Sequence, residues 1–149
     1  MIGENELTLT EVVESDCEFL YELLKNRDPH ASISHKKMPS YDEHVKFVLS
    51  KPYSKWYIIE YKKRKIGSIY LSKQDEIGIF IKKEFQSKGI GKKAIHMVME
   101  KNPRSRYLAN IAPTNTSSQE FFKKLGFRGL QYTYEIINPQ LEQFLDEKN

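Results

Sequence analysis

The fold is decided by one stretch of sequence, IGIFIKKEFQSKGIGKKA, which spans residues 77–94. Alternating isoleucines in its first half predict a strand, and the apolar spacing after the glycine pair Gly89 and Gly91 predicts a helix. Helix N-termini leave amide N–H groups unpaired and carry a positive partial charge, so they bind phosphates. Glycines let the backbone approach an anion closely. We therefore predict a pyrophosphate cradle reinforced by three lysines, Lys88, Lys92 and Lys93, although a tight turn without a ligand has the same pattern.

Outward from this stretch, strands and helices alternate. We expect strands over residues 6–12, 56–61, 66–71, 76–81 and 106–112, and one or two more in 127–137. We expect helices from Ser15 or Asp16 to about residue 27, and over 41–50, 92–101 and 115–125, with residues 29–40 as a loop. The basic run KKRK at 62–65 predicts a solvated hairpin turn. The order predicts an α/β (α+β) fold with helices on both faces of a single mixed sheet.

Length and composition set the class of protein. The 149 residues are expected to form one domain, 1–149. The single cysteine, Cys17, excludes an intramolecular disulfide and suits a reducing compartment. No apolar run approaches the roughly 20 residues of a membrane span, and the first residues do not resemble a signal peptide. These features predict a soluble cytoplasmic protein. The net charge of +4 is compatible with a polyphosphate ligand, and no RNA-binding strand motif accompanies the basic residues.

Two motifs resemble those of one known family. Gln86-Ser-Lys-Gly89-Ile-Gly91 resembles the Gln/Arg-x-x-Gly-x-Gly/Ala motif of the GCN5-related N-acetyltransferases (GNAT). Asn115-x-x-Ser118-x-x-x-Phe122-x-x-x-Gly126-Phe127 is similar to the second motif of that family. The resemblance covers residues 6–135. It implies a mostly antiparallel sheet of about six or seven strands, in which the parallel strands 76–81 and 106–112 splay apart around acetyl-CoA. It also implies direct transfer to a primary amine, without a metal and without an acyl-enzyme, so Cys17 is expected to be a core residue.

The resemblance also implies the cofactor contacts. The backbone of residues 79–81 is expected to pair with pantetheine and to polarise the thioester carbonyl, and the amides of residues 86–92 to bind the pyrophosphate. Asn115 is expected at pantetheine, Phe122 at the thiol end and Lys124 at the nucleotide. The residues expected to bind acetyl-CoA are Ile79, Phe80, Ile81, Gln86, Ser87, Lys88, Gly89, Ile90, Gly91, Lys92, Asn115, Phe122 and Lys124.

The catalytic groups do not follow directly from the family motifs, because the chain departs from the family at two positions. Phe122 stands where many relatives have a tyrosine general acid, and Asn110 stands where some have a glutamate base. The run from Glu76 to Phe80 resembles the Glu-φ-Gly-φ-aromatic strand of ribosomal-protein and sugar-nucleotide acetyltransferases. We therefore expect Glu76 to be the base, directly or through water, with room for the acceptor above Gly78; the alternative is a strand-end carboxylate paired to a neighbour.

The missing acid has two candidates on the last expected strand. Tyr132 and Tyr134 carry hydroxyls that can reprotonate the leaving thiolate, although packing in the core or at the rim is an alternative for both.

The acceptor side is expected in the first two helices and their loop. Arg27, Met38, Tyr41 and His44 lie in a segment that resembles acetyltransferases acting on 4-amino sugars carried by nucleotides. For His44, packing on its helix is the alternative. The spacing of the three histidines in this region matches no common metal site, so we expect no metal.

Three functions follow from these features. The favoured one is acetyl-CoA-dependent N-acetylation of a small amine, an amino-sugar nucleotide in particular, by a monomer or homodimer that binds neither nucleic acid nor membrane. The alternatives are acetylation of a protein N-terminus or lysine, as in ribosomal-protein acetyltransferases, and a non-catalytic CoA-binding relative.

Overall fold

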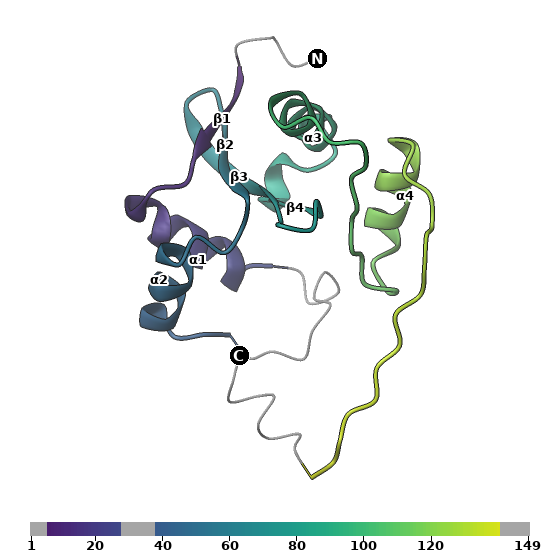
Figure 1. Cartoon of the computed structure of the whole chain (residues 1–149). Coiled ribbons are helices and arrows are strands. Elements are labelled where there is room, and N and C mark those ends of the chain that lie inside the picture. Colours follow the sequence, from purple (N-terminus) through teal and green to yellow (C-terminus); the bar gives the residue numbers. More distant parts are fainter. Residues whose placement is uncertain (1–5, 28–37, 141–149) are drawn as a thin grey trace. The chain divides into compact units, whose positions relative to one another are not determined.

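The computed structural model describes residues 6–27 and 38–140 (Figure 1). The chain divides into two compact units. The first consists of Met1–Arg27 and Tyr41–Asn110, and the second of Asp28–Ser40 and Ile111–Asn149. Most of the loop expected at 29–40 lies outside the described residues.

The first unit contains a four-stranded antiparallel sheet in the order β1-β2-β3-β4. Its strands are β1 (Leu7–Glu11), β2 (Lys55–Tyr61), β3 (Arg64–Leu71) and β4 (Ile77–Ile81). The β2–β3 connection is a two-residue turn in which Lys62 and Lys63 have φ of 51° and 67°. Positive φ at both positions matches the twist of the flanking strands, which favours such turns in hairpins. The hairpin predicted from the basic run is confirmed.

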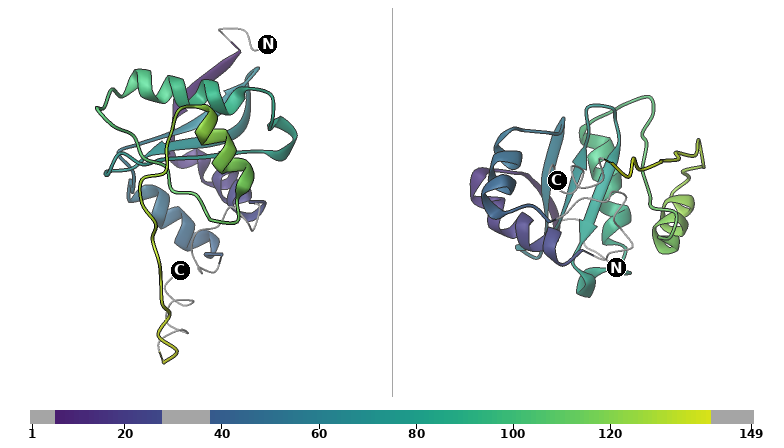
Figure 2. Two further views of the ribbon diagram at one scale, coloured as in Figure 1. Left: turned by 90° about the vertical axis from the view of Figure 1, so that its right-hand side faces the viewer. Right: turned by 90° about the horizontal axis from the view of Figure 1, so that it is seen from below.

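Helices cover both faces of this sheet (Figure 2). α1 (Cys17–Lys25) and α2 (Tyr41–Leu49) lie on one face, and α3 (Ile90–Lys101) lies on the other. Cys17 and Leu20 of α1, Val48 of α2 and Ile58 of β2 form a buried cluster on the first face. The predicted core position of Cys17 is confirmed, and burial, with Glu14 and Asp16 nearby, raises the pKa of its thiol.

Asp16 is one of the two residues expected at the start of the first helix, and its side chain does not cap that helix. It stands at the N-cap position of α1, at the end of the 3-10 turn η1 (Glu14–Asp16), but its side chain makes no capping hydrogen bond to the helix. Its carboxylate instead accepts the N–H of Val13 at 2.9 Å and pairs with Lys65 Nζ at 2.7 Å. Asp16 is only 4% exposed, and a buried carboxylate requires a charged partner. The ion pair ties α1 to β3.

The expected strand at 106–112 is reduced to one parallel bridge, between Glu76 and Leu108. Ile77 N donates to Leu108 O at 2.7 Å, and Leu108 N donates to Asp75 O at 2.9 Å. In the described part of the first unit, the pairing stops there. The two segments therefore meet only where β4 begins.

The second unit contains the helix α4 (Thr116–Lys124), which ends as predicted before Gly126, a glycine with φ of 102°. The strands expected in 127–137 were a wrong prediction for the described residues. Tyr132, Tyr134 and Ile136 alternate in the pattern of a strand but are 89%, 88% and 96% exposed. Alternation produces a strand only where a neighbouring backbone accepts and donates the ladder hydrogen bonds, and this unit has no such strand among its described residues. No helix of the described residues is both long and apolar enough to span a membrane.

Candidate active site

The loop between β4 and α3 has the geometry of an anion cradle. After the 3-10 turn η3 (Lys83–Phe85), Ser87 has φ of 62° and Gly89 has φ of 82°. Gly89 is the N-cap of α3 and offers no side-chain cap to the first amides of the helix. A Cβ added to Gly89 would meet nothing within 4 Å, so the space beside these amides is open. Gly91 lies inside α3 without a positive φ, so only Gly89 uses the conformational freedom of glycine here.

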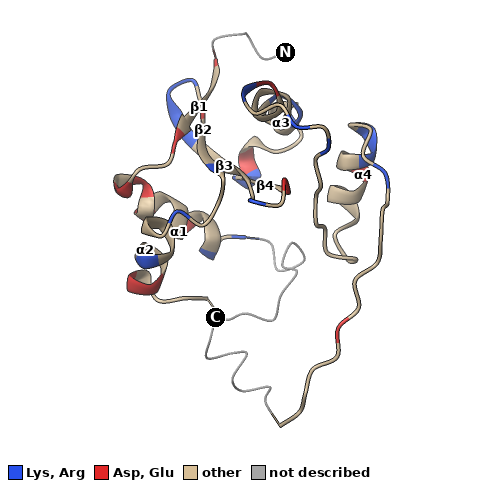
Figure 3. Ribbon diagram, in the orientation of Figure 1, with Lys and Arg blue, Asp and Glu red and all other residues tan. Residues whose placement is uncertain are grey.

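Side chains around the cradle fix the loop and make it basic. Gln86 Nε2 donates to Ile81 O at 2.9 Å, which folds the loop back onto the end of β4. The Phe85 ring has Arg64 Cζ at 5.4 Å and Lys88 Nζ at 6.0 Å from its centroid. In the ribbon of Figure 3, the basic residues of the β2–β3 turn and of α3 are blue. The cradle therefore suits a polyanion such as a pyrophosphate.

The Glu76 carboxylate is held from two sides at the start of β4. Ser72 Oγ donates to Oε1 at 2.9 Å, and Asn110 Nδ2 donates to Oε2 at 2.5 Å. Ser72 Oγ in turn accepts the backbone N–H groups of Glu76 at 3.0 Å and Gln74 at 3.2 Å. Both donors to the carboxylate are neutral, so Glu76 has no ion-pair partner in these contacts. A carboxylate has about four lone-pair sites, so Glu76 can still accept a hydrogen bond from a further donor.

Tyr70 fills the space that the sequence predicts for the acceptor above Gly78. Tyr70 and Gly78 are directly paired across β3 and β4, and a Cβ on Gly78 would collide with the ring and hydroxyl of Tyr70. The expectation of an open space at Gly78 is therefore wrong. The glycine makes room for the aromatic ring of the neighbouring strand.

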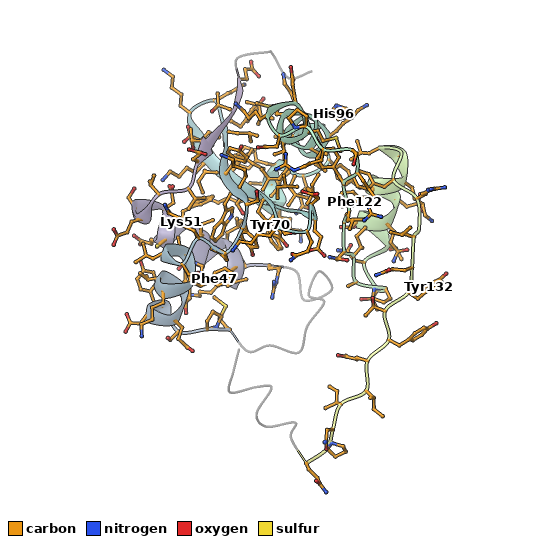
Figure 4. The ribbon with its side chains drawn as sticks, viewed as in Figure 1. Phe47, Lys51, Tyr70, His96, Phe122 and Tyr132 are labelled. Carbon is orange, nitrogen blue, oxygen red and sulfur yellow. The ribbon has the colours of Figure 1, made fainter. Side chains whose placement is uncertain are left out.

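Tyr70 belongs to an aromatic cluster that sequence analysis missed. Its ring stacks on Tyr53 with centroids 3.9 Å apart and planes 4° apart. Trp56 and Phe47 meet Tyr53 edge-on, at 4.9 and 5.9 Å. Figure 4 labels Tyr70 and Phe47. The alternation of β2 and β3 places Trp56 and Tyr70 on one face, but Tyr53 lies in a loop, so no periodicity points to it.

The residues expected on the acceptor side lie in different surroundings. The Arg27 guanidinium lies 6.0 Å from the centroid of the Phe80 ring. Tyr41 is exposed and packs edge-on against Tyr21 at 5.3 Å. His44 is 4% exposed, with its ring also 5.3 Å from Tyr21 and its Nε2 without a partner in the described residues. This burial fits the packing role. It lowers the pKa of His44, while a hydrogen bond with the Cys17 backbone acts in the opposite direction.

In the second unit, the residues of the second motif stabilise their own helix. Asn115 caps α4, because its Oδ1 accepts the N–H of Ser118 at 3.1 Å. Phe122 is buried and packs edge-on against Phe121 and Phe127, each at 5.1 Å. Lys124 and Met38 are exposed, and the rings of Tyr132 and Tyr134 lie 6.4 Å apart. Among residues 6–27 and 38–140, no cluster of three or more His, Cys, Asp or Glu could hold a metal ion.

Comparison with known proteins identifies the family. Residues 6–128 match the family described as the acetyltransferase (GNAT) domain, which is most of the chain. The chain belongs to the GNAT family. It is an acetyl-CoA-dependent N-acetyltransferase with the GNAT fold, which confirms the fold class and the general activity expected from the two motifs. No curated protein matches the sequence.

Solved structures share the GNAT fold. A domain from Methanocaldococcus jannaschii superposes with a TM-score of 0.72 at 22% identity, over 87% of this chain and 92% of that one. The dodecameric spermidine N-acetyltransferase from Vibrio cholerae has a TM-score of 0.69 at 21% identity, over 90% and 86%. A ribosomal L7/L12 α-N-protein acetyltransferase in complex with coenzyme A has a TM-score of 0.65 at 20% identity, over 82% and 80%.

Proposed function

We propose that this enzyme acetylates the primary amine of a nucleotide-linked amino sugar, with Glu76 as the base. The observation that carries the proposal is the fixed carboxylate of Glu76, which Ser72 and Asn110 orient through one oxygen each. A base held in one orientation can accept the proton of an amine, directly or through a water, as the amine attacks. Acetyl-CoA, when bound, supplies the thioester that the amine attacks.

The cofactor contacts are proposed from both units. The open cradle at Gly89 and the first amides of α3 bind the pyrophosphate, and the backbone of β4 from Ile79 to Ile81 pairs with the pantetheine. Asn115, Phe122 and Lys124 of the second motif are the further proposed cofactor residues. We propose that both units form one acetyltransferase domain, a view supported by a family match that runs through both.

The proton for the leaving thiolate has to come from a group other than Phe122, which has no hydroxyl. Tyr132 and Tyr134 are the proposed acids. Their hydroxyls are exposed, so both remain in exchange with solvent protons.

The acceptor is proposed from the charges and rings near Glu76. Arg27 lies beside Phe80, and its charge acts on Tyr70 together with that of Glu76. A cation at this position disfavours a polycation such as spermidine and favours an acceptor that carries a phosphate. Arg27, Met38, Tyr41 and His44 are the proposed acceptor residues, in which His44 acts by packing against Tyr21.

Thiol release from acetyl-CoA tests the acceptor. The purified enzyme is offered a nucleoside-diphosphate-linked 4-amino sugar, spermidine or a peptide with a free N-terminus. We expect kcat/KM for the nucleotide sugar to exceed the other two values by at least about 100-fold, the discrimination that a site built around one acceptor can reach. Preference for the peptide would support the ribosomal-protein alternative. Binding of acetyl-CoA without thiol release for any acceptor would support the non-catalytic alternative.

A further inference from the structure

The position of the Tyr70 hydroxyl is set by neighbours on two sides of its ring. The pairing of Tyr70 with Gly78 places the ring over β4, and the hydroxyl oxygen is among the atoms that a Cβ on Gly78 would meet. Tyr53 stacks parallel to the ring at 3.9 Å. The glycine on one side and the second ring on the other therefore hold Tyr70 over the middle of β4.

Charged groups lie on both sides of this hydroxyl along β4. Glu76 precedes Gly78 by two residues, and Phe80, which has Arg27 against its ring, follows by two, so all three positions share one face of the strand. Burial and the nearby Glu76 raise the pKa of Tyr70, and Arg27 acts in the opposite direction. The phenol is therefore protonated at neutral pH and has a hydrogen to donate.

This donor is available to a ligand. Among the described residues, none forms a hydrogen bond with the Tyr70 hydroxyl. The nearby donors Ser72 and Asn110 both donate to the Glu76 carboxylate instead. A hydroxyl that is fixed by packing loses little conformational entropy when it donates a hydrogen bond.

We infer that Tyr70 is an acceptor-positioning residue, whose hydroxyl, lodged over Gly78, hydrogen-bonds the acceptor and holds its amine beside Glu76. The inference rests on the proposed role of Glu76, and it assigns to Gly78 the function of admitting the Tyr70 ring. Gly78 on β4 leaves the space that the Tyr70 ring of β3 occupies, so the two residues together position the hydroxyl.

The test is the KM of the acceptor in Tyr70→Phe, which removes the hydroxyl and keeps the ring. We expect the KM for the nucleoside-diphosphate-linked 4-amino sugar to rise about tenfold, as for one lost hydrogen bond, while the Kd of acetyl-CoA stays unchanged. Tyr107→Phe is the matched control. Its hydroxyl donates to Asn102 O at 2.6 Å, so this variant loses stability without a change in acceptor KM. An unchanged KM in Tyr70→Phe would overturn the inference.

A double-mutant cycle keeps the test informative if one variant is unstable. Gly78→Ala pushes the Tyr70 ring aside and is expected to raise the acceptor KM, but to add nothing in a Tyr70→Ala background, where there is no ring to displace. Additive effects would overturn the inference. If wild-type enzyme uses spermidine or the peptide instead, the proposed acceptor fails and the same KM comparison is made with that substrate. A wild-type enzyme that acetylates none of the three overturns both.

Discussion

Asn110 donates a hydrogen bond to the Glu76 carboxylate across 34 residues of sequence. Asn110, at which the chain departs from the family pattern, therefore contacts Glu76, the proposed base. Ser72 holds the other carboxylate oxygen. In the proposed mechanism, the Asn110 amide orients the carboxylate that accepts the proton of the amine.

Replacement of the carboxylate tests the base. Glu76→Gln keeps the size of the side chain and removes its ability to accept a proton, so we expect kcat to fall by about 100-fold or more. The Kd of acetyl-CoA, measured by calorimetry, is expected to stay unchanged. Asp75→Asn is the matched control, because Asp75 is the adjacent carboxylate and pairs with Arg104 at 3.0 Å. Full turnover in Glu76→Gln would exclude Glu76 as the base.

Removal of the amide tests the orientation of that base. Asn110→Ala deletes one hydrogen bond to a charged group, worth about 1.5–3 kcal/mol, so we expect kcat to fall by about 10- to 150-fold and the Kd of acetyl-CoA to be unaffected. Steady-state kinetics with saturating acetyl-CoA measures the effect. If kcat in Asn110→Ala equals that of wild type, the contact has no role in turnover.

The cradle is tested by charge at Gly89. Gly89→Glu places an anion in the open space beside the first amides of α3, and we expect calorimetric binding of acetyl-CoA to weaken by at least about 100-fold, because two like charges meet in a partly enclosed site. Gly89→Gln is the matched control, since it imposes the same left-handed strain and nearly the same volume without the charge. Equal losses in the two variants would assign the effect to strain alone.

The buried imidazole predicts a pH-dependent stability. Since burial lowers the pKa of His44 from 6.5, the folded state binds the proton less readily than the unfolded chain. The stability that the neutral ring contributes is therefore present above pH 6.5 and is lost as pH falls through the lower pKa of the folded state. Urea unfolding between pH 7.5 and 5 measures this loss. We expect His44→Gln to flatten the dependence, and the exposed His96→Gln to leave it as in wild type.

The β2–β3 turn predicts a stabilising substitution. Lys63 has φ of 67°, a conformation that costs an L-residue about 1–2 kcal/mol and glycine little. Lys63→Gly is therefore expected to raise the free energy of unfolding by about 0.5–1 kcal/mol, after the entropy cost of glycine. Thermal unfolding measures the gain. Lys73→Gly, at an exposed turn residue without a positive φ, is expected to show no gain; a gain there would point to lost charge repulsion.

Local patterns predicted the parts of the fold that depend on neighbours in sequence. The strand, glycine loop and helix around Gly89 and the hairpin at Lys62 and Lys63 follow from residues a few positions apart. The strands expected at 106–112 and 127–137 have a suitable alternation, but a strand also needs a partner that the alternation does not specify.

In the candidate site, too, local features follow from the sequence and tertiary contacts do not. The five-residue run from Glu76 to Phe80 predicts the base, and that role stays a prediction, whereas the contact of Glu76 with Asn110 does not follow from this run. The stack of Tyr53 on Tyr70 joins a loop to a strand, so the filling of the space above Gly78 was not predictable from either segment. A tertiary contact decided each of these outcomes.

The pairing of β1 with β2 has a consequence during synthesis. Thr10 and Glu60, which are joined by a hydrogen bond across these strands, lie 50 residues apart. At roughly 5–20 residues per second, a ribosome needs several seconds to deliver the second strand after the first. During that interval β1 has no partner strand. β2, β3 and β4 are made only afterwards, as consecutive antiparallel strands that can pair with one another as they emerge. The threonines at positions 8 and 10 give the waiting strand one polar face, which reduces its tendency to associate with other nascent chains.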